Sequence, residues 1–247
     1  MMSKSMRAVV YRERGTFVLE ERPVPQIQAA TDAIVRVTLA SICSSDLHIK
    51  GGFVPRAVPG TIVGHEFVGI VEQVGDQVVS VRPGDRVAVN VETFCGHCFF
   101  CRRGFVNNCT DPNGGWALGC RIDGGQAEYV RVPYADNGLT KIPDPVTDRQ
   151  ALFTGDILST GYWAAQISQI QPEDTVLVLG AGPTGLCTMM CARLYQPAHI
   201  LVVEPDPDRR KLALARGWAD EAAASKEQAA ERLSQWTEGR GADVVLE

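Results

Sequence analysis

The sequence contains no apolar run long enough to cross a bilayer and no block of like charge. A membrane-spanning helix needs about 20 apolar residues in succession, so the first absence argues against a membrane protein. The 24 basic and 29 acidic residues give a formal net charge of −5. Their mixed distribution argues against nucleic acid or an anionic membrane as the main partner. The basic lead at residues 1–10 lacks the apolar core of a signal peptide, and there is no internal repeat.

The chain has 247 residues, 45% of them apolar, which is enough for one large domain or two smaller ones. Eight cysteines could indicate an oxidising compartment. Four of them fall between residues 95 and 109, however, and such a cluster fits metal binding in a reducing cytosol better than a disulfide framework. We therefore predict a cytoplasmic protein.

Residues 7–136 contain many short strand-like runs with Gly and Pro between them, at 7–11, 16–20, 33–38, 67–74, 86–89 and 127–132. This pattern predicts a β-barrel or sandwich. Beyond residue 147, helices alternate with buried strands, with helices at 148–153, 156–170, 183–194, 208–216 and 226–236 and strands at 175–179, 199–203 and 242–246. The alternation predicts parallel βαβ units. We place the domains at 1–155 and 156–247. Because a full dinucleotide fold needs two βαβαβ halves, we expect a longer protein.

Three residues far apart in the chain are candidates for an open zinc site. Cys43 follows a strand-like segment, His65 lies in the loop Gly64-His65-Glu66, and Asp156 precedes a helix. A catalytic zinc is held by three protein ligands and keeps a fourth position for water or substrate. Taken singly, Cys43 would more often be a buried thiol and Asp156 a helix N-cap. Their presence on one chain with the motifs described next favours the metal site.

A second set of soft ligands consists of Cys95, Cys98, Cys101 and Cys109. Four thiolates around zinc form a closed tetrahedral site that stabilises a loop and has no open position for chemistry. An iron–sulfur cluster is the rival, but its last cysteine gap is shorter and its final cysteine precedes proline, whereas here Thr110 follows. We predict a structural zinc. The remaining cysteines, Cys120, Cys187 and Cys191, are predicted to be small buried residues.

A glycine motif follows the strand-like run 175–179 and begins a helix. Its residues are Gly180, Gly182, Pro183, Thr184 and Gly185. In this context the glycines permit a tight turn and close approach of a pyrophosphate to the helix N-terminus.

Glu204 ends the next strand. A carboxylate there can accept hydrogen bonds from the adenosine ribose and repels a 2′-phosphate, so NAD is favoured over NADP. Arg209 and Arg210 follow closely and could weaken that preference. A purely structural glycine turn with a solvated Glu204 is the alternative.

Together these features resemble the zinc-dependent alcohol dehydrogenases of the medium-chain dehydrogenase/reductase family, from about Arg7 to the end of the chain. The resemblance rests on the segments 43–48, 64–66, 95–109, 159–162 and 180–185. It implies an α/β plus β fold, in which a GroES-like β-barrel catalytic domain with two zinc ions is followed by an incomplete Rossmann domain, a doubly wound parallel sheet.

The resemblance also implies the metal ligands. Cys43 and His65 would bind the catalytic zinc, and Glu66 would be a neighbour that can approach the metal or exchange onto it. Asp156 takes the position where many members have cysteine. An aspartate there is similar to the secondary-alcohol and glutathione-independent formaldehyde dehydrogenase branches. The sorbitol-type branch carries glutamate nearby, so polyols are less favoured but stay open.

Ser45 and His48 are suited to pass the alcohol proton outward, as the resembled family uses these positions. Thr160 would pack against the nicotinamide by resemblance. Without a catalytic role, Ser45 could cap a short helix, His48 could be a surface residue and Glu66 could pair with a basic neighbour. Substrate-pocket candidates, chosen by position relative to the ligands, are Val91, Phe94 and Trp116.

We therefore predict NAD-dependent oxidation of an alcohol, or reduction of an aldehyde or ketone, by hydride transfer at a catalytic zinc. The full-length form is expected to be a homodimer or homotetramer with no nucleic-acid or membrane partner. The alternative is a truncated zinc-binding protein without hydride-transfer activity.

Overall fold

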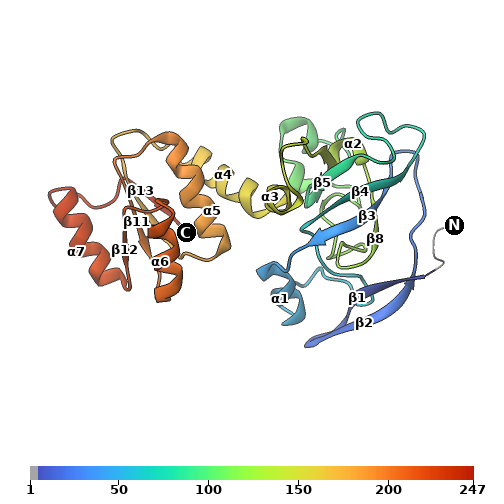
Figure 1. Cartoon of the computed structure of the whole chain (residues 1–247), viewed down its shortest axis with the longest axis horizontal. Coiled ribbons are helices and arrows are strands. Elements are labelled where there is room, and N and C mark those ends of the chain that lie inside the picture. Colours follow the sequence, from blue (N-terminus) through green and yellow to red (C-terminus); the bar gives the residue numbers. More distant parts are fainter. Residues whose placement is uncertain (1–4) are drawn as a thin grey trace. The chain divides into compact units, whose positions relative to one another are not determined.

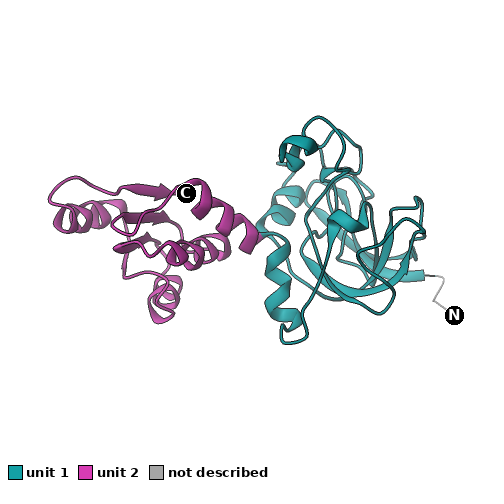
Figure 2. Ribbon diagram, turned by 90° about the horizontal axis from the view of Figure 1, so that it is seen from above, with its two compact units in different colours: residues 1–156 teal, residues 157–247 magenta. Residues whose placement is uncertain are grey.

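The computed structural model describes residues 5–247, which form two compact units that divide between Asp156 and Ile157 (Figure 2). The division leaves Asp156 in the first unit, one residue beyond the boundary predicted from the sequence. Residues 1–4 of the basic lead lie outside the described part of the chain. No helix in residues 5–247 is both long and apolar enough to span a membrane.

The first unit is built on an antiparallel sheet with the strand order β8-β3-β4-β5-β9 (Figure 1). The strands are β3 (Ala33–Ala40), β4 (Phe67–Val74), β5 (Arg86–Val89), β8 (Tyr129–Val132) and β9 (Leu139–Lys141). Successive side chains of a strand point to opposite faces. Val35, Phe67 and Val87 accordingly face one buried core, whereas Val68 and Ala88 face another.

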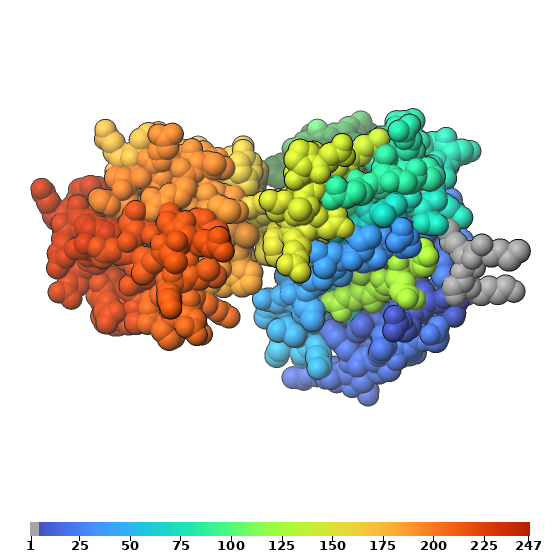
Figure 3. Space-filling view, in the orientation of Figure 1, coloured from blue at the N-terminus to red at the C-terminus, as the bar shows by residue number. Residues whose placement is uncertain are grey.

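The hairpin of β1 (Ser5–Glu13) and β2 (Thr16–Pro23) lies beside this sheet. It turns at Gly15, whose φ of +88° is unstrained only for glycine. Isolated bridges join Ala8 to Ala127 and Val10 to Ile62. In Figure 3, the lime-green residues of β8 accordingly lie between the blue strands β3 and β1.

Two-stranded and helical pieces connect these strands. They are β6 (Glu92–Thr93) with β7 (Gly115–Trp116), the helices α1 (Ser44–Lys50), α2 (Ala135–Gly138) and α3 (Asp148–Ala151), and the 3₁₀ turns η1 (Cys101–Arg103), η2 (Val106–Asn108) and η3 (Leu152–Gly155).

The predicted β-rich first domain is confirmed, but its sheet is open rather than a closed barrel. Among the described strands, β8 and β9 are the edges of the hydrogen-bonded ladder. The hairpin approaches β8 only through the isolated bridges, because no continuous ladder runs from β1 to the sheet.

The second unit contains a parallel sheet of β10 (Thr175–Leu179), β11 (His199–Val203), β12 (Glu221–Ala223) and β13 (Val244–Leu246). The strand order is β12-β11-β10-β13. The helices are α4 (Ile157–Ile167), α5 (Pro183–Ala192), α6 (Pro207–Ala215) and α7 (Lys226–Trp236), and the turn η4 (Arg193–Tyr195) follows α5.

Both faces of this parallel sheet are covered by helices. Val176 and Ile200 pack in a core with Met189 of α5. Leu201, the residue after Ile200, packs in a separate core with Leu233 of α7. The predicted doubly wound parallel arrangement is therefore confirmed within the described chain.

Candidate active site

Cys43 sits just beyond the end of β3, at the N-terminus of helix α1. Its backbone N–H donates a hydrogen bond of 3.0 Å to Oδ2 of Asp46. A side chain three residues into a helix that accepts from the preceding backbone completes a capping box. The start of α1 therefore holds the Cys43 backbone in place.

His65 lies in a loop whose first residue, Gly64, has a backbone conformation that requires glycine. Gly64 has a φ of +91°, and a Cβ there would lie 2.5 Å from Cγ of Gln126. The loop is fastened by a 2.8 Å hydrogen bond from the backbone N–H of Gly125 to the Gly64 carbonyl. The imidazole that follows is buried, and its edge meets the Trp116 ring with the centroids 5.5 Å apart.

Asp156 reaches the same place because Gly155 packs directly against β5. A Cβ on Gly155 would lie 2.1 Å from the Val89 carbonyl oxygen. The backbone N–H of Val91 donates to the Gly155 carbonyl at 3.1 Å. The chain is thus pinned to the strand one residue before Asp156.

The structure brings Cys43, His65 and Asp156 together, with their ligand atoms all within 4.8 Å of one another. Oδ2 of Asp156 lies 3.1 Å from Nε2 of His65 and 3.8 Å from Sγ of Cys43. Zinc bonds of 2.0–2.3 Å in tetrahedral geometry require donor atoms about 3.3–3.8 Å apart. Nitrogen, sulfur and oxygen donors at this spacing fit a zinc ion.

The same three side chains favour a positive charge. Burial opposes a charged imidazole, but the hydrogen bonds with Asp156 and Cys43 outweigh it and raise the pKa of His65 to about 10. A carboxylate and a sulfur therefore already stabilise a cation at this position.

Asp46 is a further candidate for the site, which the sequence analysis did not single out. It is 1% exposed, and its Oδ1 lies 3.7 Å from Nδ1 of His65. Its other oxygen accepts from the Cys43 backbone and, at 3.1 Å, from Nε2 of Gln126. A carboxylate behind a ligating imidazole fixes the ring orientation. The available signal was its place three residues after Cys43, where a capping carboxylate is expected.

The other predicted residues of the first unit lie close to this ligand set but outside it. Oγ of Ser45 is 3.5 Å from Sγ of Cys43. His48 is exposed three residues further along α1, with its ring against Phe53. Glu66 is buried and accepts a 2.6 Å hydrogen bond from the Ser41 hydroxyl. Among the described residues, the group within 4.8 Å does not include Glu66.

Cys95, Cys98, Cys101 and Cys109 form a second group of ligand atoms within 4.8 Å of one another. The Sγ–Sγ distances are 3.4 Å for Cys98 and Cys101 and 3.6 Å for Cys95 and Cys109. Sulfurs at 2.3 Å from a tetrahedral zinc lie about 3.8 Å apart, so the four cysteines also fit the metal. The backbone amides of Cys101 and Thr110 lower the pKa of Cys98 to about 5, which favours the thiolate that binds metal.

The remaining cysteines lie outside both groups. Cys120 and Cys191 are buried, as predicted, whereas Cys187 is only half-buried. It lies on α5 where Gly161 of α4 packs against the backbone, since a Cβ on Gly161 would come 2.7 Å from the Cys187 carbonyl carbon. Thr160, the residue before that contact, is exposed on α4.

The glycine motif forms the turn between β10 and α5. Gly180 has a φ of +97°, and a Cβ on Gly185 would lie 2.1 Å from the Gly180 carbonyl oxygen, so both positions require glycine. Above Gly182, the N-cap of α5, the space is open. Pro183 and Thr184 form the exposed first turn. An open helix N-terminus that a Cβ would partly fill fits a pyrophosphate.

Glu204 supports this turn from the end of β11. Its carboxylate accepts backbone hydrogen bonds from Ala181 at 2.8 Å and from Asp206 at 2.9 Å. The amide of Asp206 and that of Ala181 lower the pKa of Glu204, so the group is ionised at neutral pH. Nη1 of Arg209 lies 3.8 Å away. The acidic residue is thus held beside the glycine turn, where sequence reasoning placed it.

Comparisons with known proteins agree with both halves of the chain. Residues 29–144 match the family model of the alcohol dehydrogenase GroES-like domain. Zinc-type alcohol dehydrogenase B of Aspergillus flavus is 40% identical over 98% of this chain and 58% of its own length. An alcohol dehydrogenase of Cupriavidus necator is 36% identical over the whole chain and 70% of its own length. The chain belongs to the zinc-dependent alcohol dehydrogenases of the medium-chain dehydrogenase/reductase family.

A solved member of this family has the same fold. Zinc-dependent alcohol dehydrogenase 2 of Streptococcus pneumoniae, in its apo form, is 38% identical and superposes with a TM-score of 0.90 over 98% of this chain and 68% of its own. The chain spans a little over half the length of the Aspergillus relative.

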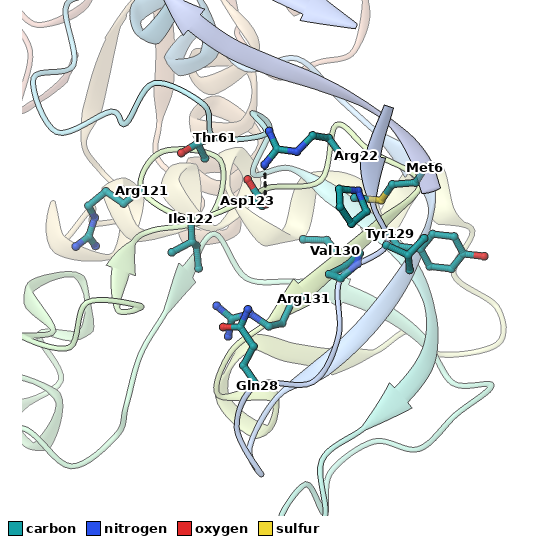
Figure 4. Close-up of a pocket in the computed structure, with 13 residues that line it drawn as sticks. Met6, Arg22, Gln28, Thr61, Arg121, Ile122, Asp123, Tyr129, Val130 and Arg131 are labelled. Carbon is teal, nitrogen blue, oxygen red and sulfur yellow. Dashed lines mark ion pairs between the residues drawn. The ribbon is translucent and has the colours of Figure 1, made fainter. Parts of the chain in front are cut away.

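In this member of the family, the first unit also has a cavity of about 420 Å³ that contains none of the ligand set (Figure 4). Three arginines line it. Arg22 lies 3.9 Å from the Asp123 carboxylate, and Arg131 lies 3.1 Å from the buried Asp32. Arg121 lies apart from both (Figure 4). Two of the three lining arginines are therefore matched by carboxylates.

Proposed function

We propose that the protein interconverts an alcohol with its aldehyde or ketone, using NAD as the hydride carrier. The convergence of Cys43, His65 and Asp156, with 3.1 Å between the imidazole and the carboxylate, is the observation that carries the proposal. In the oxidation, a hydride would pass from the carbinol carbon to C4 of the nicotinamide, and the hydroxyl proton would be released. The products are the carbonyl compound, NADH and a proton.

Cys43, His65 and Asp156 would hold the catalytic zinc, with Glu66 as a neighbour that can exchange onto it. When bound, the ion supplies Lewis acidity that lowers the pKa of an alcohol hydroxyl towards neutrality. Oδ1 of Asp46, 3.7 Å from Nδ1 of His65, would help to orient the imidazole ring. The protein groups thus determine where an alcohol oxygen is bound.

The hydroxyl proton would leave the site along side chains of helix α1. Ser45, next to Cys43, is placed to accept it. His48 is three residues later, on the same side of the helix, and is open to solvent. An imidazole can take up this proton and pass it to water.

The second unit would bind the cofactor. Gly180, Gly182, Pro183, Thr184 and Gly185 offer the pyrophosphate a helix N-terminus. The ionised Glu204 supports NAD over NADP, because it repels a 2′-phosphate and can accept from the ribose hydroxyls. Arg209 partly offsets this charge, and Thr160 would pack against the nicotinamide. The four-cysteine group would hold a second, structural zinc.

Alcohol-dependent NADH formation by the purified, zinc-loaded protein tests the proposal. We expect turnover with simple secondary alcohols that is abolished by Cys43→Ala and by chelation, and kept in the control Cys187→Ser. Metal analysis of the same samples reports bound zinc. A protein that binds zinc at both sites but forms no NADH with any alcohol would be a zinc-binding protein without hydride transfer, and the proposal would be wrong.

A further inference from the structure

Several buried polar atoms of the first unit have no hydrogen-bond partner among the described residues. They include Oδ1 of Asp46 and Nδ1 of His65 in the candidate metal site, and also Oε2 of Glu92, Nε1 of Trp116 and Nε of Arg121. Buried polar atoms without a partner are rare in native proteins, because each carries the full cost of leaving water. Such atoms near a candidate active site call for a ligand that satisfies them.

The pairing of β6 with β7 places Glu92 beside Trp116, whose ring packs against a candidate zinc ligand. Glu92 and Trp116 are direct cross-strand partners. Directly opposed residues of an antiparallel pair project from the same face, with their Cβ atoms about 5 Å apart. Since the Trp116 ring meets the ring of His65 at 5.5 Å, the Glu92 side chain stands next to a residue that touches a candidate metal ligand.

The electrostatics agree with this geometry. Burial raises the pKa of Glu92, and the charges that act on it come from Arg56, Asp156, Arg121 and His65. The guanidinium of Arg56 lies 5.1 Å from the centroid of the Trp116 ring. Glu92 is therefore a buried acceptor with two arginines in its surroundings.

We infer that Glu92 and Trp116 recognise a second hydroxyl group of the substrate, on the carbon next to the one that is oxidised. This inference rests on the proposed function and names its substrate class, vicinal diols and larger polyols. The hydroxyl donates to the Glu92 carboxylate and accepts from the Trp116 indole N–H. A hydroxyl is a small neutral group that can do both.

Charged substituents fit less well. An ammonium group can donate to Glu92 but cannot accept from the indole, and it meets Arg56 and Arg121. A carboxylate can accept from the indole but is repelled by Glu92. A methyl group leaves both buried atoms without a partner. The protein should therefore prefer substrates whose second group can both donate and accept a hydrogen bond.

Three matched secondary alcohols test the inference. Isopropanol, propylene glycol and isopropanolamine share the carbinol and differ in one substituent, which is hydrogen, hydroxyl or amine. For the unsubstituted protein, we expect kcat/KM for propylene glycol to exceed that for each of the others about tenfold or more, the usual scale for a hydrogen bond to a charged group. Equal values, or a preference for the amine, would overturn the inference.

Two variants then assign the effect to residues. Glu92→Ala should lower kcat/KM for propylene glycol by about tenfold to a hundredfold. The same substitution should leave kcat/KM for isopropanol nearly unchanged. Trp116→Phe keeps the ring against His65 and removes only the N–H, so it should lose part of the same preference. Glu231→Gln, on the exposed face of α7, is the matched control and should behave like the unsubstituted protein. Equal losses for both alcohols in Glu92→Ala would indicate a structural role instead.

Binding gives a readout that does not need turnover. Saturation-transfer NMR without NAD should show a stronger signal for propylene glycol than for isopropanol, and Glu92→Ala should remove the difference. Isopropanol oxidation without any advantage for the diol would overturn the inference and leave the proposed function intact. Absence of turnover with all three alcohols would overturn the proposed function and the inference with it.

Discussion

Oδ1 of Asp46 lies 3.7 Å from Nδ1 of His65, with both side chains 1% exposed. Asp46 also accepts a hydrogen bond from the Cys43 backbone N–H, so one carboxylate contacts two of the three candidate zinc ligands. Removing the negative charge of Asp46 should leave the side chains of Cys43 and His65 less firmly positioned, while every candidate ligand remains present.

We therefore expect Asp46→Asn to weaken zinc binding at this site by about tenfold to a hundredfold. Competition with a chromogenic chelator measures the affinity. Asp144→Asn, at an exposed position, is the control and should have no effect. Unchanged affinity in Asp46→Asn would show that the Asp46–His65 contact does not tune the metal site.

The four-cysteine segment should depend on metal for its shape. The turns η1 and η2 have no buried residues, so little apolar packing stabilises them. Chelation, or Cys98→Ala with the loss of one zinc ion per chain, should expose the segment to protease. Tryptic cleavage after the exposed Arg102 and Arg103 should accelerate at least several-fold, as mass spectrometry of the fragments would show.

Cleavage after the exposed Lys211 of the second unit serves as the internal control for that experiment, since no candidate metal ligand lies near it in the chain. Equal acceleration at Lys211 would mean that metal removal unfolds the protein generally. No acceleration at either site would contradict a structural metal.

Two glycines of the nucleotide turn should respond differently to the same substitution. Gly185→Ala places a Cβ 2.1 Å from the Gly180 carbonyl oxygen, and we expect overpacking to cost about 1–3 kcal/mol of stability. Gly182→Ala meets open space and should change stability by less than about 0.5 kcal/mol. If the pyrophosphate binds there, Gly182→Ala should nevertheless weaken NAD binding about tenfold or more, since a methyl group blocks close approach.

Thermal denaturation and calorimetric titration with NAD measure the two effects separately. The expected pattern is a lower Tm for Gly185→Ala and weaker NAD binding with an unchanged Tm for Gly182→Ala. Unaltered NAD affinity in Gly182→Ala would show that the pyrophosphate does not bind at this turn.

An ion pair at the start of α3 should make stability depend on pH. Nη2 of Arg86 lies 2.6 Å from Oδ1 of Asp148, and the Thr38 hydroxyl donates to Oδ2 at 2.8 Å. These bonds, with that of Arg86 the strongest, lower the pKa of Asp148. A group whose pKa is lowered by folding stabilises the protein above its unfolded pKa, and this contribution disappears as the pH falls through the folded value.

We expect Asp148→Asn to cost up to about 1 kcal/mol of unfolding free energy at neutral pH, a modest figure because water screens this partly exposed pair. The cost should shrink below about pH 4. Urea titrations at both pH values, with Asp144→Asn as the control, measure it. A cost that does not vary with pH would contradict the charge-based explanation.

Much of the fold was predictable because its elements are local. The runs 67–74, 175–179, 199–203 and 226–236 match the observed β4, β10, β11 and α7. Hydrophobic periodicity and neighbouring Gly or Pro determine such segments. The strands that were missed, β6, β7, β9 and β12, have only two or three residues each. Their strand pairing comes from distant partners, which a single sequence does not reveal.

For the candidate site, the sequence by itself determined which chemistry is available. It supplies a thiol, an imidazole and a carboxylate as candidate ligands, a compact set of four cysteines, and a glycine turn after a strand. Tertiary structure decided which of these meet. The resemblance predicts Glu66 as a neighbour that can approach the metal, and in the structure its carboxylate accepts a hydrogen bond from the Ser41 hydroxyl, a partner that the sequence alone does not reveal.

Asp46 and Glu92 become informative only in three dimensions. An aspartate on a short helix or a glutamate in a two-residue strand is usually solvated, and no local pattern shows that the Asp46 side chain and Oε2 of Glu92 are buried. Close packing of Gly64 against Gln126 and of Gly155 against β5 brings His65 and Asp156 together. Residue types thus set the possible reactions, whereas long-range backbone packing selects the atoms that lie within bonding distance.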